Sequence, residues 1–302
     1  MPKELYVAKR FNKATTQLIT MAQDIVAEYS RQGFSLTVRQ LYYQFVARGH
    51  IANNVQEYKR LARVVNDARL AGLLDWNAIE DRLRNVVGHA SWSDPASIIN
   101  SAAYSFRMNP WRHQPYHIEV WIEKDALSGV IEPVCRRWRV PSFACRGYTS
   151  QSEAWRAGKR FAEKKAAGKH VLVLHLGDHD PSGMDMTRDN WERLDMFTRG
   201  TGVFVERLAL NMDQVEELNP PENPAKMSDA RAAGYVEEFG HSSWELDALD
   251  PPYIDNLIDT AIRERMDQPA WDAVLAEEAK HRELLTKTAE NWTDVATYVE
   301  GL

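Results

Sequence analysis

An alternation of apolar strands with amphipathic helices, from about residue 117 to residue 210, restricts the fold more than any other feature. The segment HIEVWIE (117–123) alternates apolar and polar residues, and VLVLHL (171–176) is a continuous apolar run typical of a buried strand. Further strands are predicted at 140–145 and 202–210, with helices at 124–138, 151–166 and 184–196. This pattern predicts an α/β domain with a Rossmann-like, mostly parallel sheet and helices on both faces.

The residues before this region have helical periodicity. Helices are predicted from Lys13 to Arg31, over the short segment 35–45, and from Asn54 to Leu70. Three short helices with a basic last one resemble a helix-turn-helix or winged-helix module. Its basic side chains Lys59, Arg60, Arg63 and Arg69 are candidates for DNA phosphate contacts, although an ordinary charged surface would have the same composition.

A proline-rich segment and a change in net charge separate the two regions. Pro95, Pro110 and Pro115 predict an irregular linker over residues 91–116, and the tail from Trp271 is predicted to be an exposed helix. Residues 1–116 carry 15 lysines and arginines against 9 acidic residues, and the remainder carries 22 against 34. We therefore expect a DNA-contacting domain at 1–110 and a carboxylate-bearing domain at 111–302, although chance asymmetry would give the same charges.

Several classes of protein are disfavoured by composition. Two cysteines, Cys135 and Cys145, without a CxxC pair argue against a disulfide framework or a zinc ribbon. No apolar run approaches the roughly 18 residues that a membrane span needs, and MPKELYVAKRF lacks the apolar core of a signal peptide. We expect a cytoplasmic, nucleoid-associated protein with no membrane partner.

Three carboxylates fall where α/β sheets place their ligands, at the carboxyl ends of strands. Glu123 ends the first strand, and Asp178 and Asp180 follow the strand VLVLHL, with His179 between them. Alternate residues of an extended segment point the same way, so both aspartates can face one ion. An all-oxygen set suits Mg²⁺ or Mn²⁺, whereas the alternative is that these are loop carboxylates and helix N-caps.

The segments "EVWIEKDALSG" and "LVLHLGDHDPSGMDM" resemble a Toprim domain, the catalytic fold of topoisomerases, some primases and nucleases. The order of the motifs is similar to that of the topoisomerase VI A subunit and the meiotic double-strand-break transesterase, in which a winged-helix domain with a Thr-x-Arg-x-x-Tyr-Tyr motif comes first. Residues 37–43, TVRQLYY, match that motif, and Glu245 and Asp247 in "WELDAL" are similar to a later segment of the family.

The resemblance implies a catalytic second tyrosine, a metal held by the three carboxylates, and a homodimer in which the tyrosine of one protomer meets the metal of the other. The family works with a separate ATPase subunit. This chain has no GxxxxGK loop, which suggests a reduced, stand-alone version.

Helical geometry separates the two adjacent tyrosines without the resemblance. Tyr42 follows the apolar stripe of Val38, Leu41 and Phe45, whereas Tyr43 lies about 140° from its centre at about 100° per residue. Arg39 is one turn earlier, on the side of Tyr43. We therefore predict that Tyr42 packs and Tyr43 is exposed, with Arg39 stabilising the phenolate or the attacked phosphate. An exposed tyrosine that only stacks or hydrogen-bonds on DNA is the alternative.

These residues predict a Mg²⁺-dependent transesterase that cleaves and rejoins duplex DNA, with Tyr43, Arg39 and Glu123 as catalytic residues. A hydrolytic Toprim nuclease that does not use the tyrosine is the first alternative. A DNA-binding protein without catalytic activity is the second.

Overall fold

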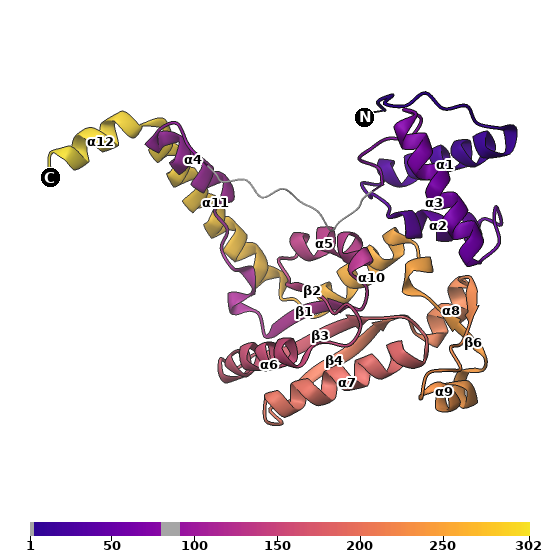
Figure 1. Ribbon diagram of the computed structural model, residues 1–302. Coiled ribbons are helices and arrows are strands. Elements are labelled where there is room, and N and C mark those ends of the chain that lie inside the picture. Colours follow the sequence, from indigo (N-terminus) through magenta and orange to yellow (C-terminus); the bar gives the residue numbers. More distant parts are fainter. Residues whose placement is uncertain (1–2, 80–90) are drawn as a thin grey trace.

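Among the residues that the computed structural model describes, 3–79 and 91–302, a four-stranded sheet forms the centre of the C-terminal part (Figure 1). The strands lie in the order β2-β1-β3-β4, and every neighbouring pair is parallel. They span Tyr116–Ile122 (β1), Ser142–Ala144 (β2), His170–Leu176 (β3) and Val203–Ala209 (β4). The predicted α/β class and parallel sheet are confirmed, and all four strands end at one edge.

Each face of the sheet packs against its own pair of helices. Leu172 and Leu174 of β3 point to the face covered by α5 and α10, and Val171 and Val173 point to the face covered by α6 and α7. These helices span Ser128–Arg137 (α5), Gln151–Ala166 (α6), Pro181–Phe197 (α7) and Pro251–Arg263 (α10). The predicted helices are present, but the first begins later because Asp125–Leu127 forms a 3₁₀ turn (η2).

The chain after β4 returns to the carboxyl edge of the sheet. Two short antiparallel strands, β5 and β6, are joined by α9, and α8 precedes them. Their bounds are Met212–Leu218 (α8), Glu222–Pro224 (β5), Ala232–Phe239 (α9) and Ser242–Trp244 (β6). His179 and Trp244 exchange backbone hydrogen bonds of 2.8 and 2.9 Å. This pairing holds the next turn, Leu246–Ala248 (η3), beside the end of β3.

Three helices form the N-terminal part, at Lys13–Arg31 (α1), Val38–Ala47 (α2) and Val55–Leu70 (α3). The side chains of Asn12, Thr37 and Asn54 cap them, which satisfies backbone N–H groups of each first turn. The bounds of α1 and α3 agree with the prediction to within one residue, whereas α2 begins three residues later and ends two residues later than the predicted segment 35–45. Residues 3–79 form isolated bridges, Leu5 with Ala71 and Leu36 with Ile79, but no strand pair that would make a wing.

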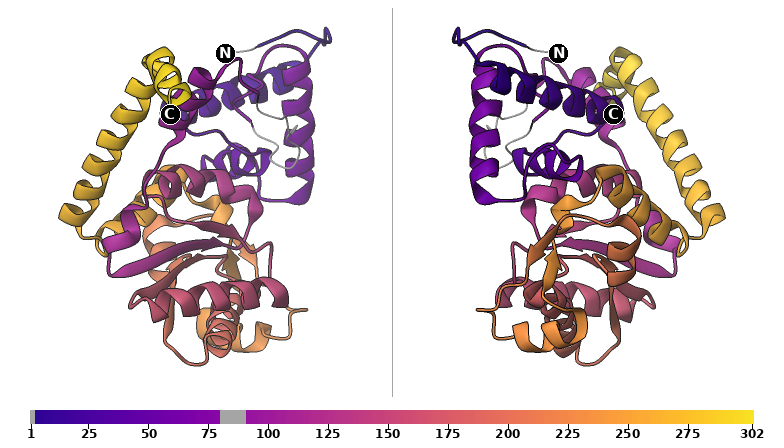
Figure 2. Two further views of the ribbon diagram at one scale, coloured as in Figure 1. Left: turned by 90° about the vertical axis from the view of Figure 1, so that its left-hand side faces the viewer. Right: turned by 90° about the vertical axis from the view of Figure 1, so that its right-hand side faces the viewer.

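A helical arm projects from the α/β part, and Figures 1 and 2 show it above the sheet, apart from the N-terminal helices, which also lie above the sheet. Pro95–Ser105 (α4) packs along Gln268–Glu290 (α11), followed by Trp292–Glu300 (α12). The prediction of an irregular linker over 91–116 is wrong there, because α4 and the 3₁₀ turn Pro110–His113 (η1) occupy much of it. The domain boundary near residue 110 stays a prediction. No helix of the described part combines the length and apolarity needed to cross a membrane.

Glu119 of β1 makes stability sensitive to acid. Its carboxylate is 2% exposed and accepts hydrogen bonds from Arg160 (2.7 and 2.9 Å) and Trp121 (3.0 Å). Burial alone would raise the pKa of Glu119, but hydrogen bonds from His117 and Arg160 outweigh it and lower the pKa to about 2. Because the pKa is lower in the folded state, this stabilisation is present above the unfolded pKa and is lost as pH falls toward 2.

We expect wild-type protein to lose about 2 kcal/mol more unfolding free energy than Glu119→Gln between about pH 5 and pH 3. Urea denaturation across this range measures the difference. Parallel pH curves for the two proteins would contradict the assignment.

Candidate metal and nucleophile site

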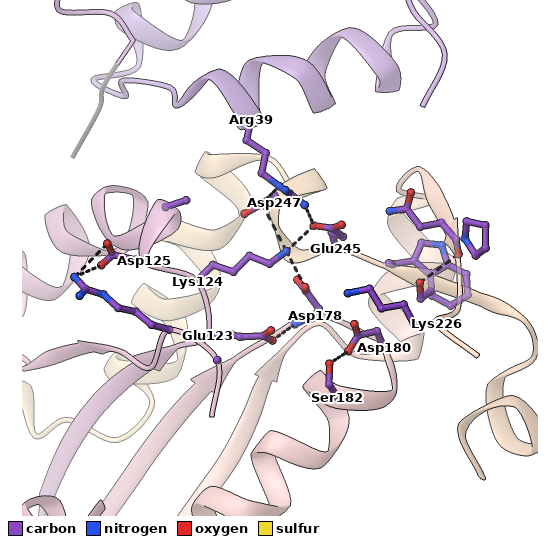
Figure 3. A pocket seen from close by; sticks show the side chains of 17 residues that line it. Arg39, Glu123, Lys124, Asp125, Asp178, Asp180, Ser182, Lys226, Glu245 and Asp247 are labelled. Carbon is purple, nitrogen blue, oxygen red and sulfur yellow. Dashed lines mark hydrogen bonds and ion pairs between the residues drawn. The ribbon is translucent and has the colours of Figure 1, made fainter. Parts of the chain in front are cut away.

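The three carboxylates predicted as metal ligands line one pocket at the carboxyl edge of the sheet (Figure 3). Glu123 directly follows β1, Asp178 comes two residues after β3, and Asp180 is the residue before α7. The pocket has a volume of about 500 Å³. Residues more than 50 positions apart in sequence meet here because parallel strands end at one edge.

Glu123 and Asp178 are buried next to each other. The backbone N–H of Asp178 donates to Oε2 of Glu123 (2.9 Å), and Oδ1 of Asp178 accepts from the N–H of Leu246 (2.8 Å). Burial raises the pKa of both carboxyl groups, since an ionised carboxylate loses hydration in the protein interior. Two buried carboxylates at one edge therefore favour a bound cation.

Asp180 has a structural task in addition to its place in the pocket. Its Oδ1 accepts from the N–H of Gly183 (2.6 Å) and from Ser182 (3.0 Å), which caps α7. At Gly183 an added Cβ would lie 2.2 Å from the carbonyl oxygen of Asp178, so the turn requires glycine. One oxygen of Asp180 is therefore the helix N-cap of the alternative prediction, and its other oxygen forms no hydrogen bond with the described residues. His179 points away from the pocket and hydrogen-bonds Tyr235 (2.7 Å).

Lys124 lies at the centre of the carboxylates. Its Nζ is 2.7 Å from Oδ2 of Asp178, 2.6 Å from Oε2 of Glu245 and 3.6 Å from Oδ2 of Asp247. Burial alone would lower the pKa of Lys124, but these carboxylates raise it, so the ammonium stays charged. Glu245 and Asp247, which entered the prediction only through the resemblance, thus belong to the same pocket.

Arg39 links the N-terminal helices to this pocket. Its Nε lies 2.6 Å from Oδ2 of the buried Asp247, and its Nη2 pairs with Glu245. The contact brings α2 onto η3, as Figure 3 shows for Arg39 reaching down from its helix. The guanidinium therefore joins two parts of the chain that are far apart in sequence.

We expect Arg39→Met to lower the unfolding free energy by about 1–2 kcal/mol. Breaking a buried ion pair costs more, but the Arg39 side chain is 42% exposed and solvent screens part of the loss. Urea denaturation measures the change, with the exposed Arg63→Met as the control, within about 0.5 kcal/mol of wild type. Equal losses in both variants would contradict an ion-pair link.

The predicted exposure of Tyr43 is wrong. Tyr43 is only 4% exposed, the same as Tyr42. Helical geometry did separate the two side chains, and Tyr42 packs toward α3 with its ring 5.4 Å from that of Tyr58. The opposite face of α2, however, is covered by η3 and does not face solvent.

Tyr43 lies beside the carboxylate pocket. Together with Arg39 and Glu245 it lines a neighbouring pocket of about 360 Å³, and the Arg39 guanidinium is 5.7 Å from its ring. Burial raises the pKa of Tyr43 to about 12, with Glu245 adding to the effect and Arg39 and Lys124 opposing it. The phenol in this conformation is therefore less acidic than a free tyrosine, contrary to the expectation from Arg39 alone.

The four basic residues predicted to contact DNA differ in their surroundings. Lys59, Arg60 and Arg63 are exposed on α3, and Arg60 and Arg63 line a surface pocket of about 420 Å³ with the N-terminal segment. Arg69 instead stacks on Trp76 at 4.4 Å and donates to its carbonyl oxygen (3.0 Å). Three of the four are thus exposed, with Arg60 paired to Glu57 (3.2 Å), and their contact with DNA stays a prediction.

Sequence reasoning undervalued two cations of the site. From the sequence alone, Lys124 could equally contact a phosphate or stand at the solvated start of a helix, and no motif singles out Arg207 of β4. Arg207 donates to the carbonyl oxygens of Asp178 (2.5 Å) and Gly183 (2.9 Å) and thereby holds the loop between β3 and α7. The available signal was a charged pair, Glu206 and Arg207, within a strand whose other residues are apolar and which ends at the sheet edge.

The donor set can be tested for its fit to Mg²⁺. No three His, Cys, Asp or Glu side chains within 3–79 and 91–302 are gathered as a ready metal site, because Asp178 is engaged by Lys124 and Leu246. Oε1 of Glu123 and Oδ2 of Asp180 form no hydrogen bond or ion pair with these residues. Mg²⁺ commonly takes one or two carboxylates and completes its shell with water and substrate phosphate, so two free oxygens fit this ion.

Comparison with known proteins adds no assignment. No family model matches the chain, and no curated protein matches it in sequence. The functional conclusion therefore depends on the motifs of the sequence and the geometry of the site.

Proposed function

We propose that this chain is a metal-dependent DNA-cleaving enzyme of the Toprim class in which Tyr43 attacks a backbone phosphate of duplex DNA. The observation that carries the proposal is the meeting, within one chain, of Arg39 and Tyr43 from α2 with the pocket of Glu123 and Asp180. These are the residues of the two motifs that resemble the topoisomerase VI A subunit.

Each group has a defined part in the reaction. Glu123 and Asp180 would hold Mg²⁺ or Mn²⁺, which supplies positive charge against the phosphate and the leaving oxygen. Arg39 offers a planar fork of donors to the phosphate. The Tyr43 oxygen bonds to phosphorus as the phenol proton passes to water, and one phosphorus–oxygen bond to deoxyribose breaks as the leaving sugar oxygen takes a proton from water to become a hydroxyl. The phosphotyrosyl ester conserves the bond energy, so the reverse attack reseals the strand.

The finer architecture is part of the same proposal. We infer a winged-helix-like domain over residues 1–110 that contacts DNA through Lys59, Arg60 and Arg63, followed by a Toprim domain. By resemblance the enzyme is a homodimer with one site for each strand, associated with the nucleoid, and any ATPase activity belongs to a separate subunit. Because Tyr43 lies beside the carboxylates of its own chain, each site is proposed to form within one protomer, and not between Tyr43 of one protomer and the metal of the other as the resemblance implies.

A hydrolytic Toprim nuclease is the second candidate, and the burial of Tyr43 favours it. A buried phenol whose pKa is raised to about 12 is a poor nucleophile, whereas metal-activated water needs no tyrosine. This candidate uses the same carboxylates and leaves free DNA ends.

One assay distinguishes these functions. Supercoiled plasmid is incubated with the protein and Mg²⁺, stopped with SDS, and analysed with and without protease. Transesterification gives cleaved DNA that carries protein until protease is added, and hydrolysis gives protein-free ends. Binding without any cleavage identifies a DNA-binding protein that is not an enzyme and overturns the proposal.

A further inference from the structure

The pocket carries more acidic side chains than one metal ion needs. Six carboxylates line it, from Glu123, Asp125, Asp178, Asp180, Glu245 and Asp247. Four cationic side chains line it as well, from Arg39, Lys124, Arg146 and Lys226. The difference is two negative charges, which one divalent cation neutralises.

Five of the six carboxylates fall into two groups around Lys124, and the sixth, Asp125, pairs with Arg146 (3.3 Å). Glu123 and Asp180 lie on one side, each with one oxygen that has no partner among residues 3–79 and 91–302. On the other side, Nζ of Lys124 lies within 3.6 Å of oxygens of Asp178, Glu245 and Asp247. The ammonium therefore occupies the point that a second divalent cation would need.

We propose that Lys124 is a built-in cation that replaces a second metal ion, so that the pocket binds one divalent cation and not two. This inference rests on the proposed metal-dependent function. It specifies how many metal ions the pocket binds and names Lys124 as the residue that determines this number. Lys124 acts as a positioning residue, because it orients Asp178 and Glu245 through its three ion pairs and holds η3 beside β3.

The test counts bound Mn²⁺ by equilibrium dialysis and electron paramagnetic resonance, without DNA. Wild-type protein and Lys124→Arg are expected to bind one Mn²⁺ per chain at saturation. Lys124→Met is expected to bind two, since Asp178 then loses its cation and Glu245 and Asp247 keep only Arg39 between them. The double variant Lys124→Met/Glu123→Gln is expected to lose the first ion and keep the second. Lys280→Met, an exposed lysine of α11, is the matched control and keeps one.

Two ions in wild type, or one ion in folded Lys124→Met, overturn the inference and leave the proposed function intact. If the wild-type protein binds no Mn²⁺, the proposed metal-dependent function is itself contradicted. Thermal unfolding establishes whether Lys124→Met is folded. If it is not folded, the number of Mn²⁺ ions bound by the wild-type protein decides the inference.

Discussion

Replacing Tyr43 with phenylalanine is expected to abolish protein–DNA adducts and to reduce plasmid cleavage by about 10³-fold or more. The substitution removes only the oxygen that would form the phosphotyrosyl bond. No hydrogen bond of that hydroxyl to the described residues is known, so the variant keeps its packing against η3 and folds. SDS-trapped complexes on end-labelled duplex DNA measure the loss directly.

Tyr42→Phe is the matched control, because it removes an oxygen from the adjacent residue. The Tyr42 hydroxyl donates to Asn53 (2.9 Å) and to the carbonyl of Asn54 (3.2 Å). Its loss is expected to cost about 1 kcal/mol of stability and to leave adduct formation unchanged. Full cleavage by Tyr43→Phe with protein-free ends would establish the hydrolytic mechanism instead.

Replacing Glu123 with glutamine is expected to reduce cleavage by on the order of 10²–10³-fold while DNA binding stays within a factor of two. The change keeps the shape of the side chain but removes a charge that would hold the metal beside the phosphate. Cleavage is measured over a titration of Mg²⁺ and Mn²⁺, and binding is measured by fluorescence anisotropy of a labelled duplex.

Glu132→Gln provides the same chemical change on the exposed face of α5, where the residue only pairs with Arg136. Its cleavage is expected to equal that of wild type. Undiminished cleavage by Glu123→Gln, at every metal concentration, would remove the carboxylate pocket from the mechanism.

Much of the fold could be predicted because it is encoded locally. Alternation in HIEVWIE and the apolar run VLVLHL fix two strands, and parallel topology then brings their ends together. The meeting of Glu123 with Asp178 and Asp180 follows from this rule, so the pocket was predictable without knowledge of any contact.

What could not be predicted depends on distant partners. The prolines around α4 are typical of a linker, but α11, about 170 residues later, provides the surface on which α4 packs as a helix. The prediction that Tyr43 is exposed was wrong for the same reason. A helical wheel describes α2 alone and does not include the η3 segment, which covers the second face of α2. Lys124 was undervalued because a lysine after a strand gives no sign of three carboxylates that converge on it.

The contact between α2 and η3 has a consequence for the order of events in the proposed reaction. With Arg39 paired to Glu245 and Asp247, the Tyr43 side chain is only 4% exposed. If Tyr43 is the nucleophile, these ion pairs have to open before a DNA phosphate reaches it, so entry of DNA and exposure of the phenol become one event. A polyanion such as DNA would compete with the two carboxylates for Arg39 and so promote this opening.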